Sequence, residues 1–560
     1  MLNIAFLNAN VITVDKNFSI KSAVWVVDGR IKLVGSNDTI RQHVDANTQI
    51  VDLGGKTLMP GFIDTHGHIA LFGLDELKTS LTGAHTREEI LARIKGAADN
   101  ASEKSWVMTT PIGTPPYFLD FEEIRRRGEL PTREQLDAAA PNNPVYIMAP
   151  TNRVPNSAIL NSLALKLAGI TNDMDTKAPI EIMQDEQGNA TGELRGAMQP
   201  LYNPYPFYQK IADVIPETTY DDIKAGIKKL APEFINGGTT SLLEAHLTHP
   251  DELRAYGELL AEGALPLRIF FTFEVEIGAS KEELKQFVTA VRFAAGNGFG
   301  DARLKVVGLS AGLDGPYWHG AACNDKPYPG PFGETVNPGT LNPAETYREI
   351  VELAVANELR LHTECAGRGS IQLAIDTLRE INARTPINER RFVLEHVEFP
   401  TPEQIGACKE LGLIPTTSTN FVWGKGAEVY RERLGKEYAD HAIPLREWLD
   451  AGVPICQSTD WGPRSAFFTL WQSLKRYAGL THEVIGEQQH ISREEAIKIF
   501  TMHGALALKM ENDIGSIESG KLADLIIVDK NPLECDEDDI RDISVLATMV
   551  GGAWAGKSLE

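Results

Sequence analysis

Between about residues 232 and 508, short hydrophobic runs alternate with amphipathic stretches whose apolar positions follow a helical spacing. We expect helices such as Lys281–Ala295, Pro343–Asn357 and Gly369–Ile381 between the runs. The runs predicted to be strands are Thr239–Leu243, Arg268–Phe273, Arg303–Val307, Arg360–His362, Phe392–His396, Ile414–Thr417 and Val453–Ser458. Repeated strand–helix units favour a parallel sheet. Together with Leu58–Thr65 they make eight strands, the number that closes a TIM (β/α)8 barrel.

Both ends of the chain have a different pattern, with short β-rich runs separated by turns. Asp28-Gly29 between two such runs predicts a hairpin. We expect residues 1–60 and 509–560 to form one β-sandwich domain, with the barrel occupying residues 61–508. Two independent β modules are the alternative, although each would be short for a core of its own.

Residues 71–230 interrupt the strand–helix rhythm after the first barrel strand and contain Pro/Tyr-rich patches at 114–118 and 202–208. An insertion at this point would lie over the C-terminal mouth of the barrel, where active sites of this fold are found. We interpret it as a cap that helps to form a substrate pocket. The alternative is a surface embellishment whose aromatic residues form its own core.

Composition narrows the classes of partner. The 560 residues carry a net charge of −23, which disfavours nucleic acid and anionic membranes. No apolar run is long enough to span a bilayer, and the N-terminus is interpreted as a strand, not a signal peptide. Five isolated cysteines indicate reduced thiols. We therefore expect a cytoplasmic protein with a small-molecule substrate. Assembly into a homo-oligomer is compatible with these observations.

The candidate chemistry begins with His66 and His68. On a strand, residues i and i+2 point to the same side, so this pair can bind one metal ion. Three further groups, His362, His396 and Asp460, each end or follow a separate predicted strand. In a barrel those ends converge on one mouth, and such ligands suit one or two divalent ions, with zinc expected first.

Lys305 lies among apolar residues on a predicted central strand. Burial lowers the pKa of a lysine and makes its amine more nucleophilic, so it could capture carbon dioxide as a carbamate that bridges two metals. Pairing with a nearby carboxylate is the alternative.

Five other residues are candidates for substrate binding near the mouth: Glu364, His246, Tyr317, Trp318 and His319. Glu364 is two residues from His362 and could support a ligand or contact substrate, or could be a rim charge. An imidazole such as His246 or His319 could stabilise a developing oxyanion, while surface or core placement is the alternative for each.

Two motifs closely resemble the amidohydrolase superfamily: Gly54–Asp64 followed by His66 and His68, and the closing Gly515–Leu525. The stretches Asn161–Ile170 and Asp185–Leu194 are similar to the family 3 branch, which contains N-substituted formamide deformylase and YtcJ-like metal-dependent hydrolases. The resemblance runs nearly end to end.

The resemblance implies a TIM barrel with a terminal β-sandwich. It places His66 and His68 on one metal and His362 and His396 on a second. Lys305 would be an N6-carboxylysine bridge between the two, and Asp460 both a ligand and the general base.

We therefore predict a metal-dependent amidohydrolase that cleaves the C–N bond of an amide or formamide. In this reaction, metal-bound hydroxide attacks the carbonyl while Asp460 accepts the proton. The aromatic-rich insertion favours a small, aryl-bearing substrate. The alternatives are a lactone, ester or carbamate hydrolase, a deaminase or an isomerase. A non-catalytic scaffold is disfavoured because every expected ligand position is filled.

Overall fold

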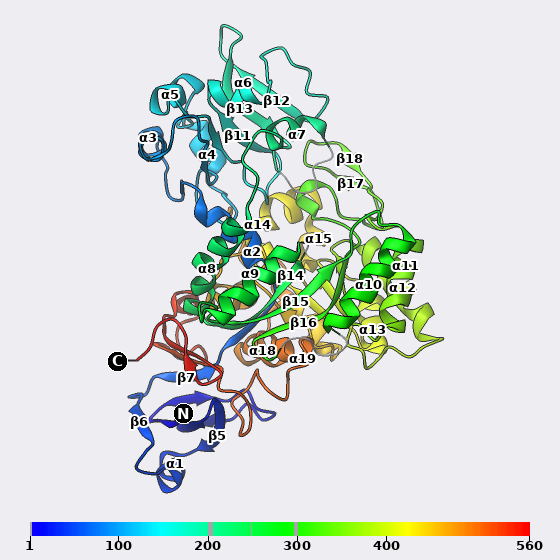
Figure 1. The fold of residues 1–560 in the computed structure, drawn as a ribbon. Helices are drawn as coiled ribbons and strands as arrows, with labels where there is room; N and C mark the ends of the chain where they lie inside the picture. The colour runs from blue at the N-terminus through cyan, green and yellow to red at the C-terminus, as the bar shows by residue number, and fades with distance from the viewer. Residues whose placement is uncertain (1–2, 200–204, 248, 296–300, 560) are drawn as a thin grey trace.

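The computed structural model describes residues 3–199, 205–247, 249–295 and 301–559. Residues 200–204, including part of the second Pro/Tyr-rich patch, lie outside the described residues. Figure 1 shows three regions: the inserted segment above, the parallel barrel in the middle, and the sheets built from the two termini below.

Eight parallel strands form one sheet that follows the order of the sequence. They are β8 (Phe62–Gly67), β14 (Thr239–Leu247), β15 (Arg268–Glu274), β16 (Leu304–Gly312), β19 (Leu361–Cys365), β20 (Val393–His396), β21 (Ile414–Thr417) and β22 (Cys456–Gln457). The first and last strands approach each other: Thr65 Oγ1 donates a hydrogen bond to the carbonyl oxygen of Gln457 at 2.9 Å. The sheet is therefore a nearly closed barrel, and the eight predicted barrel strands are confirmed.

Helices surround the barrel because each has an apolar face. In α12, the buried residues Ile371, Ile375 and Leu378 recur at the spacing of one helical face. At the start of α18 (Arg493–Ile499), Ser492 and Glu495 form a capping box, in which each side chain bonds to the other residue's backbone amide. The helices that follow barrel strands are α8 (Tyr220–Asn236), α9 (Pro250–Ala261), α10 (Lys281–Ala295), α11 (Ala344–Ala356), α12 (Arg368–Asn382), α13 (Pro402–Leu411), α14 (Asn420–Lys425), α16 (Leu445–Asp450), α17 (Ala466–Lys475), α18 (Arg493–Ile499) and α19 (Met502–Ala507).

Between β8 and β14, the chain builds a five-stranded sheet in the order β12-β13-β11-β10-β9. Its strands are β9 (Val107–Thr109), β10 (Val145–Ile147), β11 (Asn156–Leu160), β12 (Ile180–Gln184) and β13 (Ala190–Gly196). Its helices are α3 (Arg87–Asn100), α4 (Phe121–Arg126), α5 (Arg133–Ala139), α6 (Ser162–Leu167) and α7 (Pro206–Ala212). Along β11, Ala158 and Leu160 pack in one hydrophobic cluster and Ile159 in another, so both faces of this sheet are covered.

Two more sheets combine the ends of the chain. One has the order β5-β4-β1-β6, and the other, β25-β24-β23-β7-β2-β3, joins N-terminal to C-terminal strands. Their elements are β1 (Asn3–Leu7), β2 (Asn10–Ile12), β3 (Ile20–Lys21), β4 (Ala23–Val27), β5 (Arg30–Gly35), α1 (Asn37–His43), β6 (Gln49–Asp52), β7 (Thr57–Pro60), β23 (Leu525–Val528), β24 (Val545–Val550) and β25 (Ala553–Trp554). Phe6 and Val24 of the first sheet share a core with Leu58 and Ile527 of the second.

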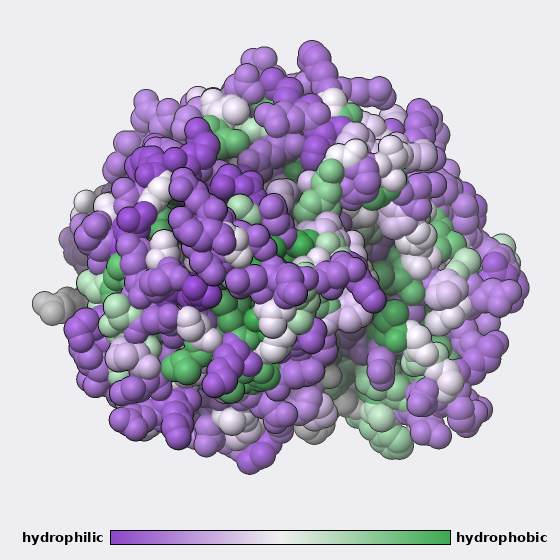
Figure 2. Space-filling model, turned by 90° about the horizontal axis from the view of Figure 1, so that it is seen from above, coloured by the Kyte–Doolittle hydropathy of each residue, from purple (hydrophilic) through white to green (hydrophobic). Residues whose placement is uncertain are grey.

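Seen from the side of the insertion, the surface is largely hydrophilic, and hydrophobic residues gather in hollows between polar ridges (Figure 2). Within the described ranges, every helix is too short or too polar to cross a membrane.

Candidate metal centre and substrate pocket

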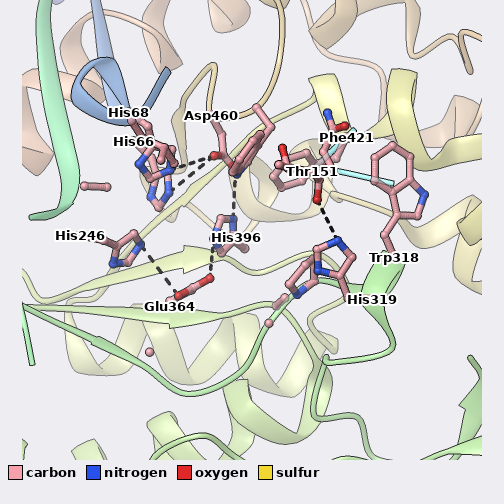
Figure 3. A pocket seen from close by; sticks show the side chains of 18 of the residues that line it. His66, His68, Thr151, His246, Trp318, His319, Glu364, His396, Phe421 and Asp460 are labelled. Atoms are coloured by element: carbon pink, nitrogen blue, oxygen red, sulfur yellow. Dashed lines mark hydrogen bonds and ion pairs between the residues drawn. The ribbon is translucent and has the colours of Figure 1, made fainter. Parts of the chain in front are cut away.

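A cavity of about 590 Å³ opens where the barrel strands end. Figure 3 shows its two sides. The residues turned toward one another on the first side are His66, His68, His246, Glu364, His396 and Asp460. Opposite them lie Thr151, Trp318 and His319. One side of the pocket therefore gathers most of its histidines and carboxylates, and the opposite side is more apolar.

His66 and His68 lie at the end of β8, as predicted from their spacing. Gly67 between them has no room for a side chain, because a Cβ there would lie 2.8 Å from Leu242. The chain then enters a short helix, α2 (Ile69–Gly73), whose first two amides donate to the carboxylate of Glu244 at 2.9 and 3.2 Å. Glu244 thereby holds the backbone that carries the two histidines.

Asp460 follows β22 and faces the same centre. Its Oδ1 lies 3.2 Å from His68 Nε2 and 3.8 Å from His66 Nε2, and its Oδ2 lies 3.7 Å from His396 Nδ1. Burial alone would raise the pKa of Asp460, but its interactions with the imidazoles around it, those of His66 and His68 first, outweigh burial and lower that pKa. Asp460 is therefore a carboxylate at neutral pH.

Glu395 is the main residue that the sequence did not reveal. It is completely buried; its Oε1 lies 3.1 Å from His362 Nδ1, and its Oε2 lies 3.5 Å from His66 Nδ1 and 3.4 Å from His246 Nε2. Strand alternation would turn Glu395 and His396 to opposite sides. His396, however, has a left-handed φ of 72°, and this break in the strand brings both side chains to the centre.

Several buried polar atoms at this centre have no well-aligned hydrogen bond to any part of the chain that the structure describes. They are His66 Nδ1, His246 Nε2, His362 Nε2, Glu395 Oε2 and Asp460 Oδ1. Leaving buried polar atoms unpaired is costly, so such a group of imidazole nitrogens and carboxylate oxygens fits a divalent metal ion. Two sets have ligand atoms within 4.8 Å of one another: His66, His68 and Asp460, and His66, His246 and Glu395.

The other histidines and Glu364 form contacts around these sets. His246 Nδ1 hydrogen-bonds to Glu274 Oε2 at 2.7 Å, and Glu364 Oε1 lies 3.5 Å from His396 Nε2. Glu364 and His246 both line the pocket, and Glu274, which the sequence analysis did not single out, lines it too. His362 contacts the centre through Glu395 and belongs to neither of the two compact sets.

The structure corrects the prediction that Lys305 bridges two metals. The predicted strand was too short: β16 continues to Gly312, seven residues beyond Lys305 (305 to 312). At about 3.3 Å per residue, this places Lys305 roughly 20 Å from the strand's C-terminal end. There its neighbours are Leu253, Leu260 and Asp301, in a separate hollow. Lys305 is not brought together with the histidines and so cannot bridge metals bound by them.

The predicted pocket residues on the loop after β16 separate into two groups. Trp318 and His319 line the cavity, and His319 Nε2 lies 3.1 Å from the carbonyl oxygen of Thr151 in the insertion. Tyr317 is fully buried outside the lining, with its ring against Phe399. Tyr317 therefore belongs to the core and not to the substrate surface.

The pocket walls carry several carboxylates. Glu244, Glu252, Glu274, Glu364, Glu398 and Asp460 all line the cavity. The ammonium group of Lys425 lies 2.7 Å from Glu398 Oε1, and Tyr430 donates to Glu398 Oε2 at 2.6 Å. This lysine is therefore already paired, and the net charge of the lining depends on the metal ion that the carboxylates at the centre would hold.

Comparisons with known proteins agree with this geometry. The family described as "Amidohydrolase family" matches residues 49–554. N-substituted formamide deformylase of Arthrobacter pascens is 27% identical over 99% of this chain and 98% of its own length. The putative amidohydrolase YtcJ of Bacillus subtilis is 24% identical over 95% of each chain.

Among solved structures, an uncharacterized metal-dependent hydrolase from Pyrococcus horikoshii has a similar fold. Its TM-score is 0.73 at 22% identity, over 96% of this chain and 99% of the other.

Proposed function

This chain belongs to the amidohydrolase family and is a hydrolase, and from this premise we propose that it cleaves the C–N bond of a small N-substituted formamide or related amide. The observation that carries the proposal is the buried set His66, His68 and Asp460, whose ligand atoms lie within 4.8 Å at the base of the pocket. The similarity to a formamide deformylase along nearly the whole chain supports the choice of bond.

We propose that His66, His68 and Asp460 hold one divalent ion, with zinc expected, and that His66, His246 and Glu395 are the ligands available to a second. His66 can serve either set because its two ring nitrogens face different carboxylates: Nε2 faces Asp460 and Nδ1 faces Glu395. Burial lowers the pKa of His66, so its imidazole is neutral and able to coordinate. A bound ion would act as a Lewis acid on water and on the substrate carbonyl.

The chain's own residues then perform the proton transfers. Asp460, a carboxylate in a buried site, accepts a proton from the attacking water and returns it to the nitrogen of the departing amine. Using one group for both steps requires that water and leaving group lie on its side of the pocket. His68 and His396 flank Asp460 and fix its orientation.

The substrate's remaining group contacts the aromatic part of the lining, to which Trp318, Phe421 and Trp461 contribute. Aromatic walls favour an apolar or aryl substituent of the substrate. We therefore propose an aryl-bearing N-substituted formamide as the preferred class.

The test combines metal analysis with a substrate panel. Purified protein should retain divalent metal by elemental analysis and release formate from neutral N-arylalkyl formamides, measured by mass spectrometry. A panel of acetamides, carbamates, lactones, esters and ring amines identifies the bond. Absence of bound metal together with no turnover after metal addition would overturn the proposal, and so would turnover of only the esters or ring amines.

A further inference from the structure

Tyr117, a residue of the insertion, lines the pocket but takes no part in the contacts described above. Its side chain is 2% exposed, yet its hydroxyl has no hydrogen-bond partner in the described ranges. A buried hydroxyl without a partner costs free energy. This hydroxyl is therefore a candidate for pairing with a bound ligand.

The surroundings of Tyr117 place it beside the reaction centre. Burial, and after it the negative charges of Asp460 and Glu398, raise the pKa of Tyr117 well above the usual value. Tyr117 therefore keeps its proton and is a hydrogen-bond donor throughout the neutral range. Glu398 already accepts bonds from Lys425 and Tyr430, so each of its oxygens has a donor other than the Tyr117 hydroxyl.

The ring of Tyr117 is held firmly. On one side it meets Trp318 edge-on, with ring centroids 5.7 Å apart. On the other it rests on Gly424 of α14, where a Cβ would lie 2.5 Å from the ring. The preceding residue, Pro116, is tied by its carbonyl oxygen to Asn152 Nδ2 at 2.6 Å. A donor fixed in this way does not need to reorganise during a reaction, which is the property of an effective oxyanion-stabilising group.

We propose that Tyr117 is a catalytic residue whose hydroxyl donates a hydrogen bond to the acyl oxygen of the substrate as negative charge develops on it. The inference rests on the proposed hydrolysis, because it needs an acyl group placed between Asp460 and the insertion. The proton stays on Tyr117, so the bond stabilises charge without transferring a proton. The insertion thus supplies part of the catalytic machinery as well as shaping the pocket.

The first test replaces the hydroxyl alone. In the metal-loaded enzyme, Tyr117→Phe should lower kcat by roughly 10²–10³-fold, the loss typical of one oxyanion donor, with KM within about threefold. Metal content should match that of the wild type, and the melting temperature should not fall, because the hydroxyl that is removed has no partner in the free enzyme. The matched control is Tyr328→Phe, another buried tyrosine, whose hydroxyl already donates to the carbonyl oxygen of Ala322 at 3.0 Å. Its kcat should stay within about twofold of the wild type.

A second variant keeps the hydroxyl but moves it. Gly424→Ala places a methyl group against the Tyr117 ring and should lower kcat as well, while Tyr117→Phe/Gly424→Ala should be no worse than Tyr117→Phe alone. Unchanged kcat in Tyr117→Phe, or a change in KM only, would overturn the role of Tyr117.

The outcomes also separate this inference from the proposed function. If the wild type cleaves formamides and Tyr117→Phe does so equally well, the inference fails and the proposed function stands. If the wild type cleaves only esters or lactones and Tyr117→Phe loses the same factor, the inference stands and the proposed bond is wrong. If no acyl compound is cleaved, both are overturned.

Discussion

At the N-terminal end of the barrel strands, Arg268 and Asp524 are buried and paired through two hydrogen bonds, of 2.6 and 2.9 Å. The amide of Gly551 donates to the same carboxylate at 2.7 Å. At the C-terminal end, Glu395 and Asp460 are equally buried, yet each keeps an oxygen without a well-aligned bond. The difference indicates that the Arg268–Asp524 pair stabilises the fold. The unpaired oxygens of Glu395 and Asp460 instead leave positions for ligands, at a cost in stability.

The largest effect is expected at the C-terminal end. Asp460→Asn should lower kcat/KM by roughly 10²–10⁴-fold, because the group that accepts and returns the proton is lost. The melting temperature of the metal-free protein should not fall, since the change removes a buried charge. Kinetics on a formamide and thermal melts of the same samples measure both quantities. Retained turnover would refute the role of Asp460.

The opposite result is expected at the N-terminal end. Arg268→Met leaves the carboxylate of Asp524 buried without its cation and should destabilise the protein by about 3–5 kcal/mol. Denaturant unfolding measures this loss, and kcat of the folded fraction should stay within about twofold of the wild type. If Arg268→Met is as stable as the wild type, the buried pair Arg268–Asp524 does not stabilise the fold.

Glu395→Gln should weaken metal retention by about 10–100-fold, because this carboxylate contacts His66, His246 and His362. Competition with a chelator, followed by elemental analysis, gives the affinity. Glu410→Gln, at a glutamate whose side chain is 74% exposed, is the control and should retain metal as the wild type does. Equal retention by Glu395→Gln and the control would remove Glu395 from the metal centre.

A smaller effect concerns the contact between His319 and the insertion. Burial lowers the pKa of His319 to about 4, although its bond with the carbonyl of Thr151 opposes this. Between pH 6.5 and 4 the unfolded chain gains a proton at this residue that the folded chain does not, so stability falls as pH falls through that window. His319→Gln should therefore lose less melting temperature than the wild type between pH 7 and 4.5, by about 2 °C or more. If the melting temperatures of the two proteins fall equally over this pH range, His319 does not contribute to the loss of stability in acid.

The smallest effect is expected at Lys305. Lys305→Met should leave both metal content and kcat/KM within about twofold of the wild type, because the residue lies at the far end of β16. If Lys305 formed a carbamate bridge between metals, the substitution would instead cause a large loss of both metal content and kcat/KM. Elemental analysis and kinetics on one preparation distinguish the two.

The sequence predicted the eight barrel strands and the convergence of His66, His68, His396 and Asp460, because both follow from local patterns: apolar runs and polar residues at their ends. It failed at Lys305 for a related reason. The apolar character of β16 does not show where the strand ends, and a strand predicted to end at Val307 puts the lysine at the wrong end of the barrel.

Glu395 and Tyr117 could not be found from the sequence on different grounds. Glu395 depends on a left-handed backbone at His396, which strand alternation does not anticipate. Tyr117 reaches the pocket only because the insertion folds back over the barrel, and such long-range packing is not encoded in the residues around it. Tyr117 does belong to the Pro/Tyr-rich patch at 114–118, but the patch does not show which of its residues reaches the pocket.

The division of the pocket between two stretches of chain has an evolutionary consequence. The histidines and carboxylates at its base come from barrel strands, whereas Tyr117, Thr151 and Asn152 come from the insertion. Sequence changes in the insertion outside Tyr117 can therefore alter which acyl compounds are accepted while leaving the histidines and carboxylates of the barrel in place. Exchanging this segment between relatives would be a direct route to new specificities on one scaffold.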